Sequence, residues 1–399
     1  MRFSPDVIRD DQPSIRKDDV GIKPSRAAPI RIVHLTSGHR AVDARIFSKE
    51  CCSLARAGYD VSLIVAGGPA SSGHGVNVVA VKRRSNRVAR ILATPIEVIV
   101  AGLRQRGLIY HFHDPELLPY GLILRALGRR VIYDVHEDLP RDILIKEWIP
   151  SYLRRPASLA ASVLEWVAAR TLSGIVAATP VIARRFPKDR SVLVQNYPVR
   201  SEFTNSNDVP SVQCRGVAYV GAVTCDRCAV ELVQAIARVE RFPDARLLIA
   251  GTAESPSFVE KLTALPGWSR VDYCGHINRA GVHRLLAGAR MGIALFYPRQ
   301  TYIESQPVKL FEYMAAGLPV IAADFPRFRE ILEGNRCSLC VSPLDVPAIA
   351  SAIEWILGHP KEADEMGKRG RELVASSYNW EQEEPKLLRL YECIAGMGR

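Results

Sequence analysis

The 399-residue sequence lacks a hydrophobic run long enough to cross a bilayer, which takes roughly 20 consecutive apolar residues. The longest apolar stretches, such as residues 91–103, are shorter and are interrupted by polar residues or proline. The first 29 residues are polar and carry mixed charge, so they do not resemble a secretory signal. We therefore expect a cytoplasmic protein without membrane spans, with a peripheral position on the cytoplasmic face of the membrane as the alternative.

The sequence also lacks a G-x-G-x-x-G fingerprint after either predicted first strand, which argues against a dehydrogenase. Its nine cysteines are an odd number without a secretory context, so we expect reduced thiols. Cys225 with Cys228, and Cys337 with Cys340, have the spacing of zinc ligands and could together form a four-thiolate site. Small buried thiols in an apolar strand are the simpler explanation, and we expect no bound metal and no cofactor.

What the sequence does contain is an excess of positive charge, formally +11, which is unevenly distributed. Residues 30–199 hold 24 Lys and Arg against 13 Asp and Glu, whereas residues 200–399 hold 23 against 24. This asymmetry favours an anionic partner for the first half. The densest basic segment, residues 81–106, is typical of an amphipathic helix on anionic lipid, or equally of a packed helix with solvated arginines. No nucleic-acid-binding motif accompanies the charge, so nucleic acid is not an expected partner.

Short apolar strands alternate with helical segments along most of the chain, as in parallel sheets covered by helices on both faces. One series runs from RIVHLTS to SVLVQN, and a second from GVAYVG to SLCVSP, with a stretch rich in Asn, Ser and Pro between them. The predicted fold class is α/β, with two Rossmann-like doubly wound domains facing a central cleft at the carboxyl ends of their strands. The expected divisions are a disordered arm over 1–29, domains over 30–199 and 200–378, and a C-terminal helix over 379–399.

The most informative segment for function is ESQPVKLFEYMAAGLPVIAAD, which begins at Glu304. Pro307 suits a first helical turn and Gly317 the left-handed position after the last, so a helix is predicted between them. The amide end of a helix favours negative charge and Lys309 would add a cation, so a diphosphate could bind there without a metal. Glu304 and Glu312 could accept hydrogen bonds from sugar hydroxyls at both ends of such a ligand, or could be solvated charges.

This segment resembles the donor-binding signature of family-4 glycosyltransferases of the GT-B fold, in which two glutamates seven residues apart precede an Ala-Gly-Pro turn. The resemblance extends over about residues 30–395 and implies that Glu304 contacts the donor sugar and Glu312 the ribose. In VGAVTCDRC, Gly221 and Arg227 match the loop in which a basic residue holds the donor diphosphate.

The sequence departs from the family pattern at three places. The glycines common after the first glutamate are replaced by Ser, Gln and Pro. An earlier basic residue of the diphosphate loop is Ala222 here, and the glycine that usually follows the basic position is Cys228. These departures keep a catalytically inactive donor-binding protein open as an alternative.

The resemblance implies further site residues at strand ends. His136, in IYDVHEDLP, is expected to contact the donor sugar near the reacting centre, and His113 and Asp114, in HFHDPELLP, to shape the acceptor side. A metal site built from His111, His113 and Asp114 is conceivable, but the sequence shows no fourth ligand for it.

Three more donor contacts are expected in the loops. Gly38, in LTSGHR, would let the backbone approach the donor phosphate. His276 and Ile277 follow Gly275 in DYCGHIN, where the family places the nucleotide base against the main chain. The family resemblance also implies that the last helix crosses back onto the first domain.

We therefore predict a hexosyltransferase-type glycosyltransferase that moves a sugar from a nucleotide-diphosphate-sugar to an acceptor hydroxyl with retention. The first domain would serve the acceptor, a saccharide or a lipid-linked polysaccharide intermediate, and the second the donor; an anionic membrane surface is a further expected partner. Glu304 and His136 are the candidate catalytic residues. A sugar-nucleotide epimerase of the same fold is the other alternative.

Overall fold

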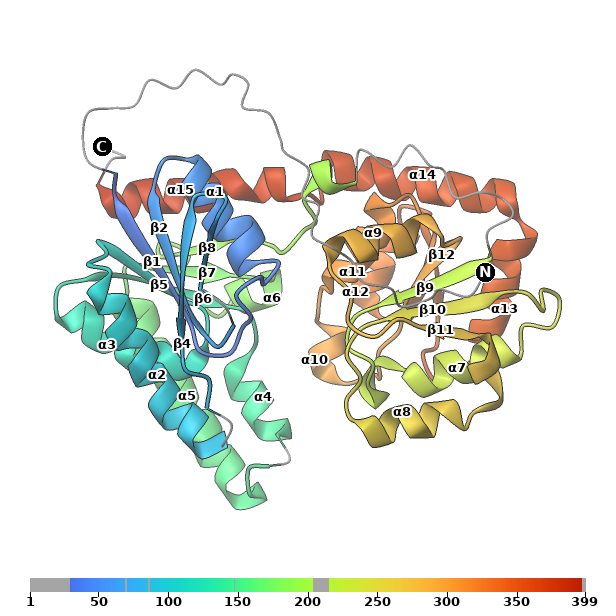
Figure 1. The fold of residues 1–399 in the computed structure, drawn as a ribbon, viewed down its shortest axis with the longest axis horizontal. Coiled ribbons are helices and arrows are strands. Elements are labelled where there is room, and N and C mark those ends of the chain that lie inside the picture. Colours follow the sequence, from blue (N-terminus) through green and yellow to red (C-terminus); the bar gives the residue numbers. More distant parts are fainter. Residues whose placement is uncertain (1–28, 69, 85–86, 147, 204–214, 397–399) are drawn as a thin grey trace.

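The structure is a computed structural model that describes residues 29–68, 70–84, 87–146, 148–203 and 215–396. Most of the arm predicted over residues 1–29 lies outside the described residues. The described chain forms two α/β domains, each built on its own sheet (Figure 1). This confirms the predicted α/β class with two doubly wound domains.

The first domain contains an eight-stranded sheet in the order β3-β4-β2-β1-β5-β6-β7-β8. β3 pairs antiparallel with β4, and the other neighbours pair in parallel. The chain reverses its direction of travel across the sheet between β1 and β5, which makes this the topological switch point. The strands are β1 (Arg31–Thr36), β2 (Asp60–Ala66), β3 (Ser71–Gly73), β4 (Val76–Val81), β5 (Ile109–Phe112), β6 (Arg130–Val135), β7 (Gly174–Ala177) and β8 (Ser191–Leu193).

Helices cover both faces of this sheet, which explains why its central strands are almost wholly apolar. One face packs against α2, α3 and α5, and the other against η1 and α1. The helical segments are η1 (Ile46–Cys51), α1 (Cys52–Arg56), α2 (Arg87–Arg104), η2 (Pro115–Leu117), α3 (Leu118–Ala126), α4 (Leu139–Ile145), α5 (Ser151–Thr171) and α6 (Pro180–Ala183).

The second domain contains a six-stranded sheet in the order β11-β10-β9-β12-β13-β14, with every neighbouring pair parallel. This is the Rossmann strand order, and its switch point lies between β9 and β12. The strands are β9 (Gly216–Val220), β10 (Arg246–Ala250), β11 (Val271–Tyr273), β12 (Met291–Ala294), β13 (Val320–Ala323) and β14 (Ser338–Val341). The helical segments from the linker onward are η3 (Arg200–Glu202), η4 (Cys225–Arg227), α7 (Ala229–Ala237), α8 (Pro256–Thr263), η5 (Pro266–Arg270), α9 (Arg279–Ala287), α10 (Gln300–Ile303), α11 (Val308–Ala315), α12 (Pro326–Phe328), η6 (Arg329–Glu333), α13 (Val346–Gly358) and α14 (Pro360–Ser376).

The last helix, α15 (Trp380–Ala395), leaves the second domain and packs on the first, so the two red helices α14 and α15 extend across both domains in Figure 1. Trp380 and Tyr391 are both buried there. The Trp380 indole Nε1 donates to Ser53 Oγ at 2.9 Å. Because Trp380, Leu387 and Tyr391 belong to the hydrophobic core of the first domain, this domain depends on the C-terminal end of the chain for part of its core.

Polar side chains join the loops of the two domains where the sheets face each other. These contacts link residues that are more than 100 positions apart in sequence, so they fix how the two domains sit in this structure. The pairs are Arg40 Nη1 with His276 Nε2 at 3.1 Å, Arg141 Nη1 with Glu304 Oε2 at 2.6 Å, and Gln195 Nε2 with Gln306 Oε1 at 2.7 Å.

Candidate active site

Two basic side chains of the second domain converge on one glycine at its switch point. Gly221 directly follows β9, and a Cβ atom placed on it would lie 3.1 Å from Arg227 Nη1 and 3.4 Å from Lys309 Nζ. Arg227 ends the short helical turn η4, and Lys309 is the second residue of α11, close to the predicted helix start. The structure therefore brings together three residues that the sequence assigned to the donor diphosphate.

Lys309 occupies an unusual position for an ammonium group. The side chain is buried, and Nζ lies 4.1 Å from the centre of the Tyr219 ring and 5.0 Å from that of Phe296. Among the described residues, none offers Nζ a hydrogen-bond acceptor. Burial, and then the charge of Arg227, hold the pKa of Lys309 well below its ordinary value. An anion beside Gly221 would supply both the missing acceptor and the missing countercharge.

Glycines allow the strand ends around this point to approach one another closely. Gly221 N donates to Ala250 O at 2.9 Å, and Gly251 N donates to Gly275 O at 2.7 Å. Gly221, Gly251 and Gly275 all have positive φ angles, and a Cβ on Gly251 would lie 1.7 Å from the Gly221 carbonyl oxygen. No other residue fits at position 251 without moving the backbone.

Cys228 occupies the position where the family usually has glycine, and its own backbone lies in a region that favours glycine. The residue has φ 56° and ψ 32°, in the left-handed region, and it is the N-cap of α7. Its side chain is buried in the core of the second domain. Cys228 thus has the left-handed conformation that glycine adopts most readily.

The two glutamates of the signature each pair with an arginine from another element. Glu304 follows α10 and binds Arg141 of the first domain. Glu312, on α11, is 9% exposed and binds Arg279, which also donates to Glu202 at 2.6 Å. Both carboxylates are thus held in place by cations, and a donor would add hydrogen bonds to these pairs or replace them.

In the first domain, Asp134 contacts His136, the residue predicted to bind the donor sugar. Asp134, at the end of β6, is buried, and its Oδ2 lies 2.8 Å from Nε2 of His136. The same carboxylate accepts hydrogen bonds from Arg45 and from His113 Nδ1. His136 keeps 21% of its side chain exposed. Asp134 therefore fixes the orientation of the imidazole while leaving it accessible.

His39 joins this group although the sequence analysis did not select it. Its ring lies 5.4 Å from the His136 ring, and its Nδ1 lies 3.1 Å from Asp114 Oδ1. Burial opposes protonation, but the hydrogen bond to Asp114 and its negative charge outweigh it and raise the pKa of His39 to about 9. His39 is therefore a cation at neutral pH, in the loop of the first switch point.

The structure places the two predicted acceptor-side residues inside the domain. His113 and Asp114 are both buried. Asp114 accepts from Thr36 Oγ1 at 2.6 Å and from Ser37 N at 2.7 Å, and a Cβ on Gly38 would lie 2.7 Å from its Oδ1. Asp114 thus organises the Gly38 loop from the interior of the domain.

The remaining predictions have mixed placements. His276 is exposed and contacts Arg40 across the domain interface, and Ile277 is half-buried beside it. The two Cys-x-x-Cys pairs do not come together as one four-thiolate group, because none of the clusters of metal-ligating side chains in the described part of the chain contains a cysteine. The missed residues Arg40, Arg141 and Arg279 lie in or next to the motifs in sequence, but their pairing with side chains of other elements gives no local signal.

The chain is similar in sequence to known glycosyl transferases. Residues 215–359 match the family described as glycosyl transferases group 1. The phosphatidyl-myo-inositol mannosyltransferase of Mycobacterium tuberculosis is 29% identical over 165 residues, which cover 40% of this chain and 42% of that protein. The MMP alpha-(1->4)-mannosyltransferase of Mycolicibacterium hassiacum is 23% identical over 334 residues, or 78% of this chain and 74% of the relative.

A solved structure shares the fold over nearly the whole chain. The sucrose-phosphate synthase of Thermosynechococcus elongatus superimposes with a TM-score of 0.71 and 20% identity, covering 93% of this chain and all of that one. The architecture is therefore that of the GT-B glycosyltransferases, as predicted. The match to the group 1 glycosyl transferases lies within its second domain.

Proposed function

We propose that the protein is a glycosyltransferase that transfers a sugar from a nucleoside-diphosphate donor to an acceptor hydroxyl with retention. The observation that carries this proposal is the convergence of Lys309 and Arg227 on Gly221. A buried ammonium without an acceptor is costly, and it is stabilised when an anion binds beside it. The relatives named as mannosyltransferases support transfer chemistry, although the chain spans less than half of the first one.

In this proposal the two cations act on the leaving group. The bond from the anomeric carbon to the donor phosphate breaks while a bond to the acceptor oxygen forms on the same face of the sugar. Negative charge then develops on the departing diphosphate, where Arg227 and Lys309 stabilise it. The acceptor's proton passes to an oxygen of that diphosphate, so no dedicated base is assigned.

The sugar is oriented by side chains from both domains. Glu304 can accept hydrogen bonds from its hydroxyls, and His136 meets it from the first domain, with Asp134 holding the imidazole. Protonated His39 adds a positive charge close to His136 and favours the anionic donor. The family resemblance implies that Glu312 contacts the ribose and that His276 and Ile277 lie against the nucleotide base.

The test is a transfer assay with a panel of nucleoside-diphosphate sugars. Arg227→Ala and Glu304→Ala should each lower kcat/KM by about 100-fold, because charged contacts in such sites contribute several kcal/mol. Arg299→Ala is the matched control, since Arg299 pairs with Asp226 on the surface of the same loop region. Near-normal turnover in both site variants would reject the site. Isomerised sugar formed from donor alone would indicate an epimerase instead, and nucleotide binding without turnover an inactive protein.

The acceptor domain exposes apolar side chains on the outer side of its helices. On α2, Leu92, Ile96 and Val100 are exposed at four-residue spacing, so they form one stripe. None of the described helices is both long enough and apolar enough to cross a bilayer. Basic residues such as Arg104 accompany this stripe, a combination typical of a helix that lies on anionic lipid.

A second stripe lies on α5, which covers the same face of the sheet as α2. Leu159, Val163 and Trp166 are 66%, 54% and 58% exposed, and Tyr152 is also exposed near the helix start. Arg170 stacks on the Trp166 ring at 4.0 Å. Aromatic rings with adjacent arginines suit the headgroup region of a membrane. We therefore propose that this face rests on an anionic membrane, where it meets a lipid-linked acceptor.

Vesicle flotation tests the membrane proposal. The wild-type chain should float with vesicles that contain anionic lipid and bind less to neutral ones. Leu159→Ser combined with Val163→Ser should reduce the bound fraction by about tenfold, given the apolar area removed. Leu344→Ser removes a leucine of the second domain that is 49% exposed and should have no effect. Equal flotation of the α5 double variant and the wild type would refute this docking face.

A further inference from the structure

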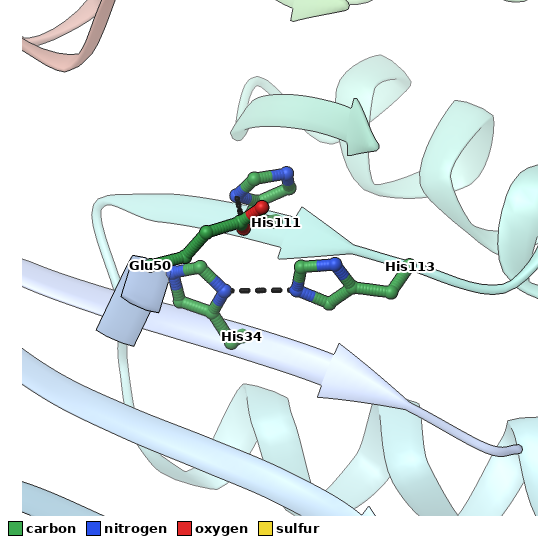
Figure 2. Close-up of side chains that lie close together, drawn as sticks. All are labelled: His34, Glu50, His111 and His113. Atoms are coloured by element: carbon green, nitrogen blue, oxygen red, sulfur yellow. Dashed lines mark hydrogen bonds and ion pairs between the residues drawn. The ribbon is translucent and has the colours of Figure 1, made fainter. Parts of the chain in front are cut away.

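Four potential metal ligands lie together inside the first domain, beneath its switch point. His34 comes from β1, His111 and His113 from β5 and the residue directly after it, and Glu50 from η1 (Figure 2). All four are buried, and one potential ligand atom from each lies within 4.8 Å of the others. A group of three imidazoles and one carboxylate is a donor set that transition metals favour.

Strand register produces this grouping. His34 and His111 are directly paired residues of neighbouring parallel strands, and His113 follows His111 on the same side of the sheet. This side is covered by η1 and α15, which bring Glu50 and Tyr391 over the three imidazoles. Figure 2 shows Glu50 reaching toward His111 while His34 faces His113.

The hydrogen bonds around the cluster leave one nitrogen without a partner. Both oxygens of Asp134 accept hydrogen bonds from Arg45, as a carboxylate does, so His113 Nδ1 donates to Asp134. His113 Nε2 then accepts from His34 Nδ1 at 2.9 Å, and His34 Nε2 accepts from the Tyr391 hydroxyl.

The Tyr391 oxygen in turn accepts from His111 Nδ1 at 2.6 Å. His111 Nε2 therefore carries a lone pair, and among the described residues nothing donates to it. Both Glu50 oxygens are also buried without a hydrogen-bond donor, although Arg45 Nε lies 3.0 Å from one of them. Such atoms need an explanation in a protein interior.

The outer contacts already match those of a metal centre. Metal-bound imidazoles usually turn their second nitrogen to a carboxylate or another polar group. His113 turns Nδ1 to Asp134, and His111 and His34 each turn one nitrogen to Tyr391. The nitrogens that remain are His113 Nε2, His34 Nδ1 and the unpartnered His111 Nε2.

We propose that His34, His111, His113 and Glu50 bind one Zn²⁺ ion inside the first domain, as a structural site. Four protein ligands complete a tetrahedral zinc site and leave no open position for a substrate. Two nitrogens bound to one zinc ion are separated by about 3.3 Å, so the 2.9 Å between His34 and His113 needs to widen only slightly. When zinc binds, the hydrogen bond between His34 and His113 is replaced by a bond from each residue to the metal. The proton on His34 Nδ1 then moves to Nε2, which faces Tyr391.

The protonation states of the ligands suit this role. Burial lowers the pKa values of all three histidines, which keeps their imidazoles neutral and able to ligate. A metal site of His111, His113 and Asp114 was conceivable from the sequence. In the structure, Asp114 is bound to the Gly38 loop instead. His34 and Glu50 complete the ligand set.

Metal analysis of the full chain, purified without an affinity tag from zinc-supplemented cells, tests the proposal independently of any transferase activity. We expect about one zinc per chain, as in structural sites. Glu50→Gln and His111→Gln should retain at least about tenfold less, since each removes a ligand. The control His359→Gln, at a partly exposed histidine of the second domain, should retain it in full.

Two measurements on the wild type keep the proposal testable if the variants fold poorly. Removal of the ion by a chelator should lower the thermal midpoint, and Zn²⁺ alone should restore it. Substituted Co²⁺ should show ligand-field bands without the near-ultraviolet absorption of cobalt thiolates. Metal-free protein that melts unchanged with or without Zn²⁺, thiolate absorption, or full zinc retention in Glu50→Gln would each overturn the assignment and leave a purely hydrogen-bonded network.

Discussion

Replacing Lys309 with methionine should make the protein more stable and at the same time weaken its binding of nucleoside diphosphates. Methionine has nearly the length and volume of the lysine stem, so it can keep the contacts with Tyr219 and Phe296. It removes an ammonium group that has no acceptor among the described side chains. A residue retained for its fold alone would not behave in this way.

The size of each effect follows from the surroundings of Nζ. An unsatisfied buried donor costs about 1–3 kcal/mol, and more when it is charged. Cation–π attraction to the two aromatic rings offsets about 0.5–2 kcal/mol of this cost. The variant should therefore gain about 1 kcal/mol, or about 2–4 °C in the melting of the second domain. A charged hydrogen bond to phosphate contributes about 1.5–3 kcal/mol, so the dissociation constant should rise by roughly 10- to 150-fold.

The pH dependence has a definite sign. Because burial lowers the pKa of Lys309 in the folded state, the unfolded chain binds the extra proton more readily. The destabilisation is complete below the lowered pKa and disappears as the pH rises to the ordinary lysine value of 10.5. The stability advantage of Lys309→Met over the wild type should therefore shrink as the pH approaches that value.

Chemical denaturation at several pH values and calorimetric titration with UDP, GDP, ADP and dTDP measure both effects. Lys261→Met, an exposed lysine on α8, is the control and should change neither quantity by much. The reasoning is refuted if Lys309→Met binds the preferred diphosphate within twofold of wild type. It is also refuted if the variant is less stable by more than 1 kcal/mol at neutral pH, which would show that the ammonium has a structural partner.

Two further predictions concern backbone approach and charge. Gly251→Ala should cost more than about 4 kcal/mol or prevent folding, because its Cβ would lie 1.7 Å from the Gly221 oxygen, whereas Gly73→Ala, with nothing within 4 Å, should cost less than about 1 kcal/mol in urea denaturation. For His39, whose folded pKa is raised to about 9, the stabilisation should be complete below its ordinary value of 6.5 and be lost as the pH rises through 9. The stability difference between wild type and His39→Gln should follow that curve, and an imidazole NMR titration with a midpoint near 6.5 would contradict it.

The sequence predicted the general arrangement of the site because parallel sheets leave few choices. Loops that follow the first and fourth strands of a Rossmann domain meet at its switch point. Gly221 and Arg227 follow β9, and Lys309 lies after β12, so their proximity was foreseeable from strand order alone. The helix that carries Lys309 was likewise predicted within one residue at each end, since Pro307 and Gly317 mark its limits.

Packing across the fold could not be predicted in the same way. Nothing near Lys309 in sequence indicates that Tyr219 and Phe296 enclose its ammonium group. The arginines that bind Glu304 and Glu312 come from α4 and α9, and only the folded chain brings them there.

Strand register accounts for the most important omission. In the sequence, His34 is a polar residue within an apolar strand. Its position opposite His111 depends on the pairing of β1 with β5, which the sequence does not specify. Glu50 lies in a helical segment, η1, and only the fold brings it to the three histidines. The structure begins that helical segment at Ile46, because Asp43 accepts hydrogen bonds from the amides of Arg45 and Ile46.

A crystal structure of the protein with its preferred nucleoside diphosphate tests the central claim most directly. The account predicts that the diphosphate lies beside Gly221, with phosphate oxygens within hydrogen-bonding distance of Lys309 Nζ and the Arg227 guanidinium. A diphosphate bound elsewhere, with the Lys309 ammonium still enclosed by Tyr219 and Phe296 and without an acceptor, would contradict it.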